Sequence, residues 1–206
     1  SEPVFGNEFT LYTISNSSKR YQVTMPSPLA HSISGYVIYQ IPRTTNYLRS
    51  SPLRMNYWLV YAVFISNAPD IDFIIQLFLD EKIHRGFTHS ITATLIVSLF
   101  AGLVGVIFWK SRWKVLLLLT FIIYSFHLIL DALTAGGAGM QLLWPLSEDY
   151  YRFPFSLFPP VHHSRGLFDW SHLIFLIYES VYSLLLLWGL KRWQFSQKQV
   201  QKNIIK

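Results

Sequence analysis

The sequence contains no cysteine, which excludes disulfide bonds and thiolate metal ligands. Any metal site must therefore be built from imidazole, carboxylate and water. Charged residues are also scarce: they make up 14% of the 206 residues, whereas soluble domains carry about a quarter. Because 51% of the residues are hydrophobic, this composition indicates a membrane protein with one compact domain.

The chain also lacks the features of a nucleic-acid-binding protein. No basic run interleaved with aromatic residues and no groove-reading motif is present, although the net charge is +6. The basic residues instead gather at the ends of apolar runs, as positive residues do in cytoplasmic loops. The three groups are Arg43, Arg49 and Arg54; Lys110, Arg112 and Lys114; and Lys191, Arg192, Lys198, Lys202 and Lys206. We expect no nucleic-acid partner.

Apolar runs predict four membrane spans, at residues 57–79, 87–109, 115–133 and 170–190. A run at 29–41 is too short to cross alone and predicts a re-entrant or interfacial helix. The expected fold is therefore an all-α, polytopic membrane helical bundle, without internal repeats. Residues 1–24 are expected to form an N-terminal extension or arm, residues 25–192 the membrane-embedded domain, and residues 193–206 a polar basic tail.

Charge counting predicts the orientation of this bundle. With the loops at 43–54, 110–114 and 191–206 in the cytoplasm, that side holds eleven Lys and Arg residues, and the opposite segments 80–86 and 134–169 hold four. We therefore expect a multi-pass protein of the cytoplasmic (inner) membrane.

Seven ionisable residues lie inside or at the ends of the apolar runs, and the predicted orientation brings them to the extracytoplasmic side. A charged side chain at the centre of a membrane helix costs about 2.5–3.5 kcal/mol on insertion scales, so such residues indicate a bound partner. For imidazoles and carboxylates the simplest partner is a metal ion. The seven candidate ligands are His31, Asp70, Asp72, His84, His89, His127 and Asp131.

The spacing of these residues suits shared ligation. His127 and Asp131 are four positions apart on a predicted helix, so both side chains lie on one face; the alternative is a hydrogen bond between the two. Pro69 is expected to break the helix at Asp70 and Asp72, because proline lacks the backbone donor. The alternative for this stretch is a simple turn between helices, capped by aspartates.

The stretch from His84 to Ser90, with the sequence HRGFTHS, is the most specific motif. Gly86 permits a tight bend, and Thr88 or a neighbour is expected to cap the following span. The guanidinium of Arg85 suits a phosphate or carboxylate oxygen, since it donates two parallel hydrogen bonds. The alternative is a solvated turn.

Four blocks in this order resemble the signature of the YdjM-like family of inner-membrane metal-dependent hydrolases. They are MPSPLAH at 25–31, APDID at 68–72, HRGFTHS at 84–90 and HLILD at 127–131, and the resemblance covers residues 25–180. It implies that Met25 is the usual start, that the seven residues above form the site, and that Glu179 corresponds to a late family glutamate.

Seven nitrogen and oxygen ligands exceed the needs of one tetrahedral zinc. They allow either a two-metal centre with a bridging aspartate, which we favour, or one metal with a general base and supporting residues. We expect a divalent metal, zinc in the first place with manganese or iron as alternatives, as one or two ions. The expected catalytic residues are Asp72, His84, Arg85, Arg152 and Arg165, the arginines binding an anionic group.

A phosphoester suits this positive charge, and a lipid suits the location. We therefore expect hydrolysis of a phospholipid or lipid-linked phosphoester, with membrane lipids as partners. Aromatic residues of the 134–169 loop, such as Trp144 and Phe153, fit an interfacial belt or an acyl-chain groove. Two alternatives remain: a transporter, since buried acidic and His residues also line ion pathways, and a non-catalytic scaffold.

Overall fold

The computed structural model describes residues 28–44, 55–73, 75, 85–108, 113–135, 139–161 and 169–205. These residues form the helices α1 (Pro28–Thr44), α2 (Met55–Asn67), α4 (Ile91–Phe108), α5 (Trp113–Ala132) and α6 (Trp170–Ile205), and the short 3₁₀ helix η1 (Phe87–His89). Within this part of the chain there are no strands, only two isolated bridges. The expected all-α class is confirmed.

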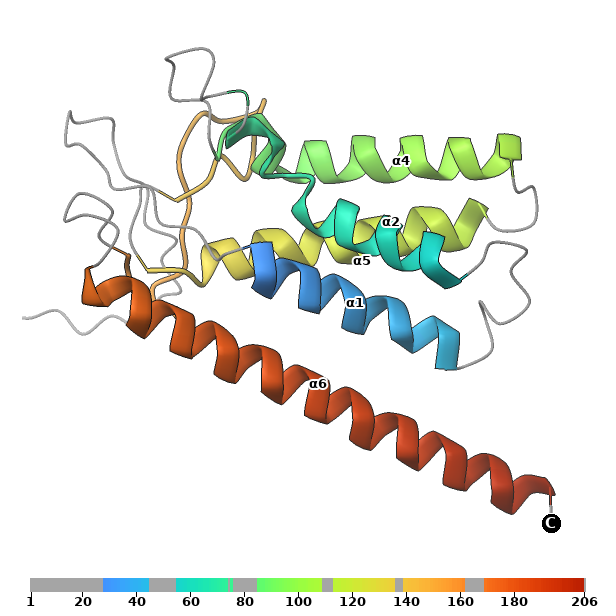
Figure 1. Ribbon diagram of the computed structural model, residues 1–206. Coiled ribbons are helices and arrows are strands. Elements are labelled where there is room, and N and C mark those ends of the chain that lie inside the picture. The colour runs from blue at the N-terminus through green and yellow to red at the C-terminus, as the bar shows by residue number, and fades with distance from the viewer. Residues whose placement is uncertain are drawn as a thin grey trace, which may run out of the picture.

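Three of these helices are long and apolar enough to cross a membrane: α4, α5 and α6. The run predicted as the first span, 57–79, is helical as α2 only up to Asn67, and its apolar part, Tyr57–Asn67, is too short to count as a span by itself. The number of four spans was thus approximate. Figure 1 shows α1, α2, α4 and α5 running beside one another, with the long α6 along α1.

Small residues bring α4 and α5 close together. The buried residues of α4 are Thr94, Ser98, Gly102 and Gly105, and a Cβ atom on Gly105 would lie 2.8 Å from Leu116 of α5. Helices in membranes pack through such small residues, because apolar side chains gain nothing by leaving lipid. The opposite face of α4 carries exposed apolar residues such as Leu99 and Phe100, as expected for a lipid-facing surface.

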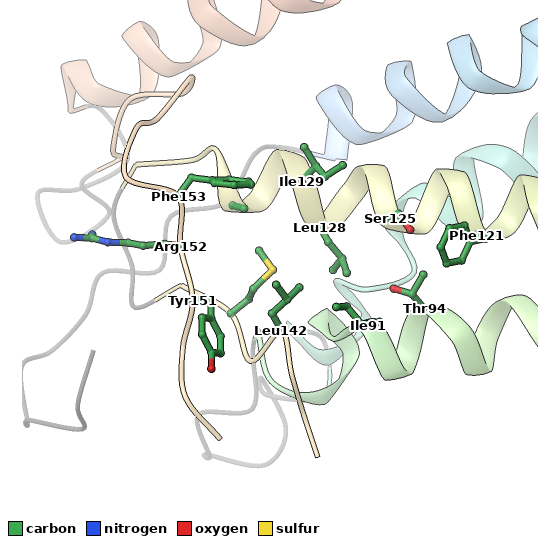
Figure 2. A pocket seen from close by; sticks show the side chains of 12 residues that line it. Ile91, Thr94, Phe121, Ser125, Leu128, Ile129, Leu142, Tyr151, Arg152 and Phe153 are labelled. Atoms are coloured by element: carbon green, nitrogen blue, oxygen red, sulfur yellow. The ribbon is translucent and has the colours of Figure 1, made fainter. Parts of the chain in front are cut away.

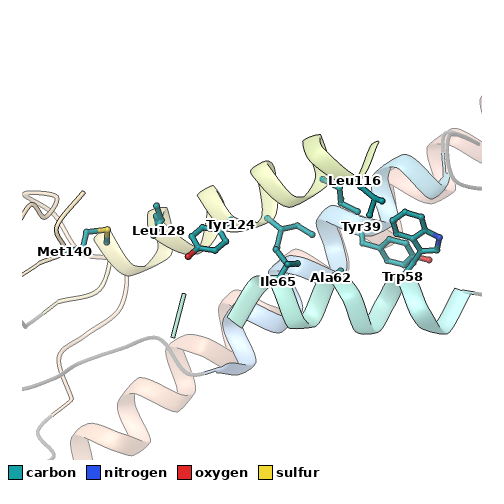
Figure 3. Close-up of a cluster of buried hydrophobic side chains, with 10 residues drawn as sticks. Tyr39, Trp58, Ala62, Ile65, Leu116, Tyr124, Leu128 and Met140 are labelled. Atoms are coloured by element: carbon teal, nitrogen blue, oxygen red, sulfur yellow. The ribbon is translucent and has the colours of Figure 1, made fainter. Parts of the chain in front are cut away.

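Close packing also joins α1 to α2. A Cβ atom on Gly35 would lie 2.8 Å from both the carbonyl oxygen of Ala62 and the Cβ of Ser66. Apolar side chains fill the space from these helices to α5, among them Tyr39, Trp58 and Leu116 (Figure 3). This core holds the ends of α2 and α5 in fixed positions.

The last helix continues beyond the residue where the sequence predicts a polar tail. Residues 193–205 extend α6, which reaches past the other helices in Figure 1. Within the bundle α6 packs mainly on α1, where Tyr182 and Ser34 share a hydrogen bond of 2.8 Å.

An irregular segment, 139–161, covers the end of the bundle where α5 ends and α4 begins. Met140 and Tyr151 pair through two backbone hydrogen bonds of 3.0 and 2.8 Å. Gly139 adopts a φ of 93°, and a Cβ there would overlap the Tyr151 carbonyl oxygen, so glycine is required at this position. Backbone bonds from Gln141 to Arg85 and from Ile91 to Leu142 tie the segment to the start of α4.

Candidate metal centre

The end of α2 presents the first pair of acidic residues. Pro69 cannot donate a backbone hydrogen bond, and the chain leaves the α-helix at Asn67. The N–H groups of Asp70 and Ile71 then donate to carbonyls three residues earlier, at 3.2 Å each. The predicted break is confirmed, and it turns the following carboxylates towards the interior of the bundle.

The segment 85–90 positions His89. Arg85 has a φ of 64°, the left-handed conformation that costs a non-glycine residue about 1–3 kcal/mol. The expected bend at Gly86 is present, and Gly86 has a φ of −82° and a ψ of −131°. Ser90 caps α4, since its Oγ accepts from the Ala93 N–H at 3.0 Å. This turn aims His89 into the core.

Four side chains converge on one point: Asp70, His89, His127 and Asp131, each offering one ligand atom within 4.8 Å of the others. His89 Nε2 lies 3.2 Å from Asp131 Oδ2, 3.5 Å from Asp70 Oδ1 and 3.3 Å from His127 Nε2. His127 Nε2 lies 3.6 Å from Asp70 Oδ1 and 3.9 Å from Asp131 Oδ2. A zinc ion with bonds of about 2.0–2.1 Å separates its tetrahedral ligands by about 3.3 Å, so these distances suit one ion.

Hydrogen bonds orient both imidazoles. His127 Nδ1 lies 2.8 Å from the Ser66 carbonyl oxygen, and His89 Nδ1 lies 3.2 Å from Asp72 Oδ2. Because both partners accept, each Nδ1 carries the proton, and each Nε2 faces the common point. Carbonyl and carboxylate partners of this kind orient metal-ligating histidines. At 3.9 Å from Asp131 Oδ2, His127 Nε2 is too distant for the direct hydrogen bond considered as an alternative.

Asp72 lies behind His89 and outside the four-residue group. In addition to His89, its Oδ2 accepts hydrogen bonds from the Arg85 N–H at 3.0 Å and from the Thr88 hydroxyl at 2.5 Å. With several donors on one oxygen, this carboxylate holds His89 and the turn at Arg85 in place.

His31 of α1 completes the wall of the centre. Its ring stacks on that of His127, with centroids 3.8 Å apart, and its Nε2 lies 3.4 Å from Asp131 Oδ1. Asp131 therefore directs one oxygen at His31 and the other at His89 and Arg85, whose Nε is 3.4 Å away. The guanidinium of Arg85 compensates for part of the buried negative charge.

The carboxylates and His89 perturb one another's protonation. Burial lowers the pKa of His89, but the close carboxylates of Asp131, Asp70 and Asp72 outweigh burial and raise this pKa well above its usual value. Burial raises the pKa of Asp70, but the nearby imidazoles of His89 and His127 outweigh burial, so this pKa is lowered. The carboxylates therefore favour the protonated form of His89.

The donor atoms fit a divalent metal ion. Among the described residues, the buried atoms without a hydrogen-bond partner include Asp70 Oδ1, both carboxylate oxygens of Asp131 and both ring nitrogens of His31. Buried polar atoms are costly when unsatisfied, and a cation at the common point would satisfy the oxygens. Imidazole with carboxylate suits zinc, manganese or iron. Among the described residues, no other group of three or more His and acidic side chains is arranged to hold a metal ion.

The seven predicted ligands thus take different places. The structure brings together Asp70, His89, His127 and Asp131, with His31 beside them and Asp72 behind His89. His84 and Arg165 lie outside the described residues. Arg152 lies on the 139–161 segment and is exposed.

Sequence reasoning missed two groups at this centre. The Ser66 carbonyl orients His127, and a backbone group gives no signal in a sequence. The Thr88 hydroxyl binds Asp72, and its place inside HRGFTHS was the available signal. Glu179, noted from the family resemblance, is 1% exposed on α6.

Comparison with known sequences supports a relationship along most of the chain. A sequence model of the family described as YdjM inner membrane protein matches residues 25–197. Inner membrane protein YbcI of Escherichia coli strain K12 is 32% identical over 101 residues, which are 45% of this chain and 55% of YbcI. The chain thus aligns with about half the length of this relative. No solved structure matches the chain.

Proposed function

This chain belongs to the YdjM inner membrane protein family, and from this premise we propose that it is a membrane-bound metal-dependent hydrolase acting on a phospholipid or lipid-linked phosphoester. The observation that carries the proposal is the pair of inward-facing Nε2 atoms of His89 and His127, 3.3 Å apart beside Asp70 and Asp131. Hydrogen bonds orient the two imidazoles, and the carboxylate oxygens that face them have no hydrogen-bond partner. These four side chains therefore form a preorganised ligand set.

A divalent ion bound here would supply Lewis-acid chemistry, which activates water for attack on an ester. The protein's own residues hold that ion and shape its surroundings. Asp72 and the Ser66 carbonyl fix the two imidazoles, and the buried surroundings strengthen every electrostatic interaction. We therefore assign Asp72 the positioning of His89 rather than the role of general base.

The substrate would approach past Asp70. Its side chain is 16% exposed, whereas those of His89, His127 and Asp131 are 0% exposed. Arg85 approaches the same centre through Asp131 and offers positive charge to an anionic oxygen. The charge distribution of the loops favours an extracytoplasmic position for Asp70.

Elemental mass spectrometry of the detergent-purified protein tests the metal centre. We expect at least one equivalent of zinc, manganese or iron in the wild type, and its loss in His89→Ala and Asp131→Ala. His172→Ala is the matched control, because His172 lies in the first turn of α6 and outside the ligand group. A folded wild type that stays metal-free after reconstitution would contradict the metal-dependent hydrolase.

Turnover needs a second assay, in which phosphate or phosphoalcohol release is followed from phospholipid vesicles containing the protein. We expect release that stops on chelation and returns with added metal. A metal-loaded protein without release from phospholipids or lipid-linked phosphoesters would favour the transporter or scaffold alternatives instead.

A further inference from the structure

A recess lies on a different face of α5 from the ligand group. It is a groove of about 310 Å³ between α4 and α5, closed at one end by the 139–161 segment (Figure 2). Such a volume is typical of small-molecule sites. The α5 wall consists of Phe121, Ser125, Leu128, Ile129 and Ala132, and apolar side chains dominate the lining. We name this recess the α4–α5 groove.

Helix geometry separates the α4–α5 groove from the metal centre. Phe121, Ser125, Leu128 and Ala132 recur at helical spacing and share one face of α5. His127 and Asp131 precede Leu128 and Ala132 by one residue each, so they point about 100° away. The groove and the centre are therefore distinct sites on the same turns of one helix.

The dimensions of the groove match one leaflet of a membrane. From Phe121 to Ala132 the rise is about 16 Å at 1.5 Å per residue, and half of a hydrocarbon core is about 15 Å. Both walls are helices able to span a membrane, so the medium outside the groove is acyl chain. The α5 wall of the groove ends at Ala132, where α5 itself ends.

Positive charge marks the closed end. Arg152 lines the groove there, is exposed, and projects outward beyond the helices in Figure 2, at the end opposite Phe121. Tyr151 and Phe153 flank it, as aromatic residues do at membrane interfaces. An arginine at this level suits the phosphate of an anionic headgroup.

We propose that the α4–α5 groove binds an acyl chain of an anionic phospholipid, with Arg152 at the headgroup phosphate. The 139–161 segment, which closes the groove, is bonded to the residues beside the metal centre. The Gln141 N–H donates to the Arg85 carbonyl and the Ile91 N–H donates to the Leu142 carbonyl, each at 3.0 Å. Lipid binding stands by itself, whereas the assignment of this lipid as the substrate rests on the proposed function.

Photolabelling tests the proposal. The full chain is placed in vesicles containing phosphatidylglycerol with a diazirine in one acyl chain, and labelled residues are mapped by mass spectrometry. We expect labels concentrated on Phe121, Ser125 and Leu142. Labels spread evenly over the exposed faces of α4 and α6, or a groove covered by a second copy of the chain, would overturn the proposal.

Groove-filling variants sharpen the test. Ser125→Phe and Ile129→Trp should each reduce labelling about five-fold or more, equivalent to about 1 kcal/mol of lost binding. Ile122→Phe is the control, since Ile122 lies on α5 outside the groove and is 42% exposed. Unchanged labelling in both folded groove variants would overturn the proposal.

The headgroup is tested by comparing phosphatidylglycerol with phosphatidylcholine. The wild type should label more strongly with phosphatidylglycerol, and Arg152→Gln should remove this preference; equal labelling of the wild type would overturn the role of Arg152. Metal content should not change in the groove variants. Groove labelling in a protein that binds no metal would contradict the proposed function and support lipid binding. Metal binding without groove labelling would contradict lipid binding and leave the proposed function in place.

Discussion

The Nε2 atoms of His89 and His127 lie 3.3 Å apart, although 38 positions separate the two residues in the chain. Each ring's Nδ1 is committed to an acceptor, Asp72 for His89 and the Ser66 carbonyl for His127. Two neutral rings in these tautomers would face each other with lone pairs alone, which is unfavourable without a cation between them or a proton on one ring. The geometry therefore couples metal binding to the loss of a proton.

Substitution of Asp72 tests how far the centre depends on the residue behind His89. Asp72→Asn keeps the shape of the side chain but removes the charge that holds the Nδ1 proton of His89. Loss of such a supporting group typically lowers metal affinity 10–100-fold, and we expect about that loss in a metal titration with a competing chelator.

The control for Asp72→Asn is Asp149→Asn. Asp149 is exposed on the 139–161 segment, where it bonds Ser147. This variant should bind metal as the wild type does. Equal affinity of Asp72→Asn and the wild type would mean that His89 needs no partner to keep its orientation.

The contact between α1 and α2 provides a second prediction. Gly35→Ala forces a Cβ to within 2.8 Å of the Ala62 carbonyl and of Ser66, so α2 must shift. Because the carbonyl of Ser66 holds His127, we expect both a lower melting temperature and weaker metal binding. Overpacking of this kind costs about 1–3 kcal/mol, measured by thermal unfolding in detergent.

Gly189→Ala separates this steric effect from the general effect of replacing glycine in a helix. A Cβ on Gly189 would meet no atom within 4 Å, and alanine in a helix is more stable than glycine by about 0.5–1 kcal/mol. This variant should melt slightly higher and keep its metal affinity. A Gly35→Ala protein with unchanged affinity would show that α1 packing and the metal centre are independent.

The sequence predicted much of this centre because its side chains leave local signals. The spacing of His127 and Asp131 places them on one helix face, and Pro69 predicts the break before Asp70. Asp72 could not be told from Asp70, because both follow the same break and only the tertiary contacts of His89 and Thr88 distinguish them.

The limits of the first predicted span have a similar cause. Hydropathy continues from Tyr57 to Leu79 in the sequence, but Pro69 and two aspartates end α2 at Asn67. A hydropathy window averages over such a break, whereas the backbone cannot.

The strained backbone of Arg85 gives a third prediction. At a φ of 64° glycine avoids the steric cost that alanine retains. Arg85→Gly should therefore be more stable than Arg85→Ala by about 1 kcal/mol in thermal or denaturant unfolding, although both lose the charge beside Asp131. At Arg152, which is not among the described residues with positive φ, the glycine variant should be no more stable than the alanine variant. The same order at both sites would refute strain at Arg85.

Metal binding should depend on pH in a direction set by His89. Its pKa is raised well above the usual value by Asp131, Asp70 and Asp72, despite burial, so metal-free His89 keeps its proton to a higher pH than an ordinary histidine does. The metal binds the neutral imidazole and must displace that proton. Affinity should therefore go on rising above about pH 6.5, where an ordinary histidine has lost its proton, with a slope of about tenfold per pH unit while His89 stays protonated. Competition titrations at pH 6, 7 and 8 measure this slope.

Asp72→Asn provides the discriminating comparison for this pH dependence. Removing one of the carboxylates that raise the pKa of His89 should shift the rising part of the affinity curve to lower pH. At high pH, where metal affinity depends on the orientation of His89, the variant should bind metal more weakly than the wild type. As the pH falls, the variant should lose less affinity than the wild type. A wild-type affinity that levels off just above about pH 6.5, as for an ordinary histidine, or a curve that Asp72→Asn leaves in place, would show that the carboxylates hold no competing proton on His89.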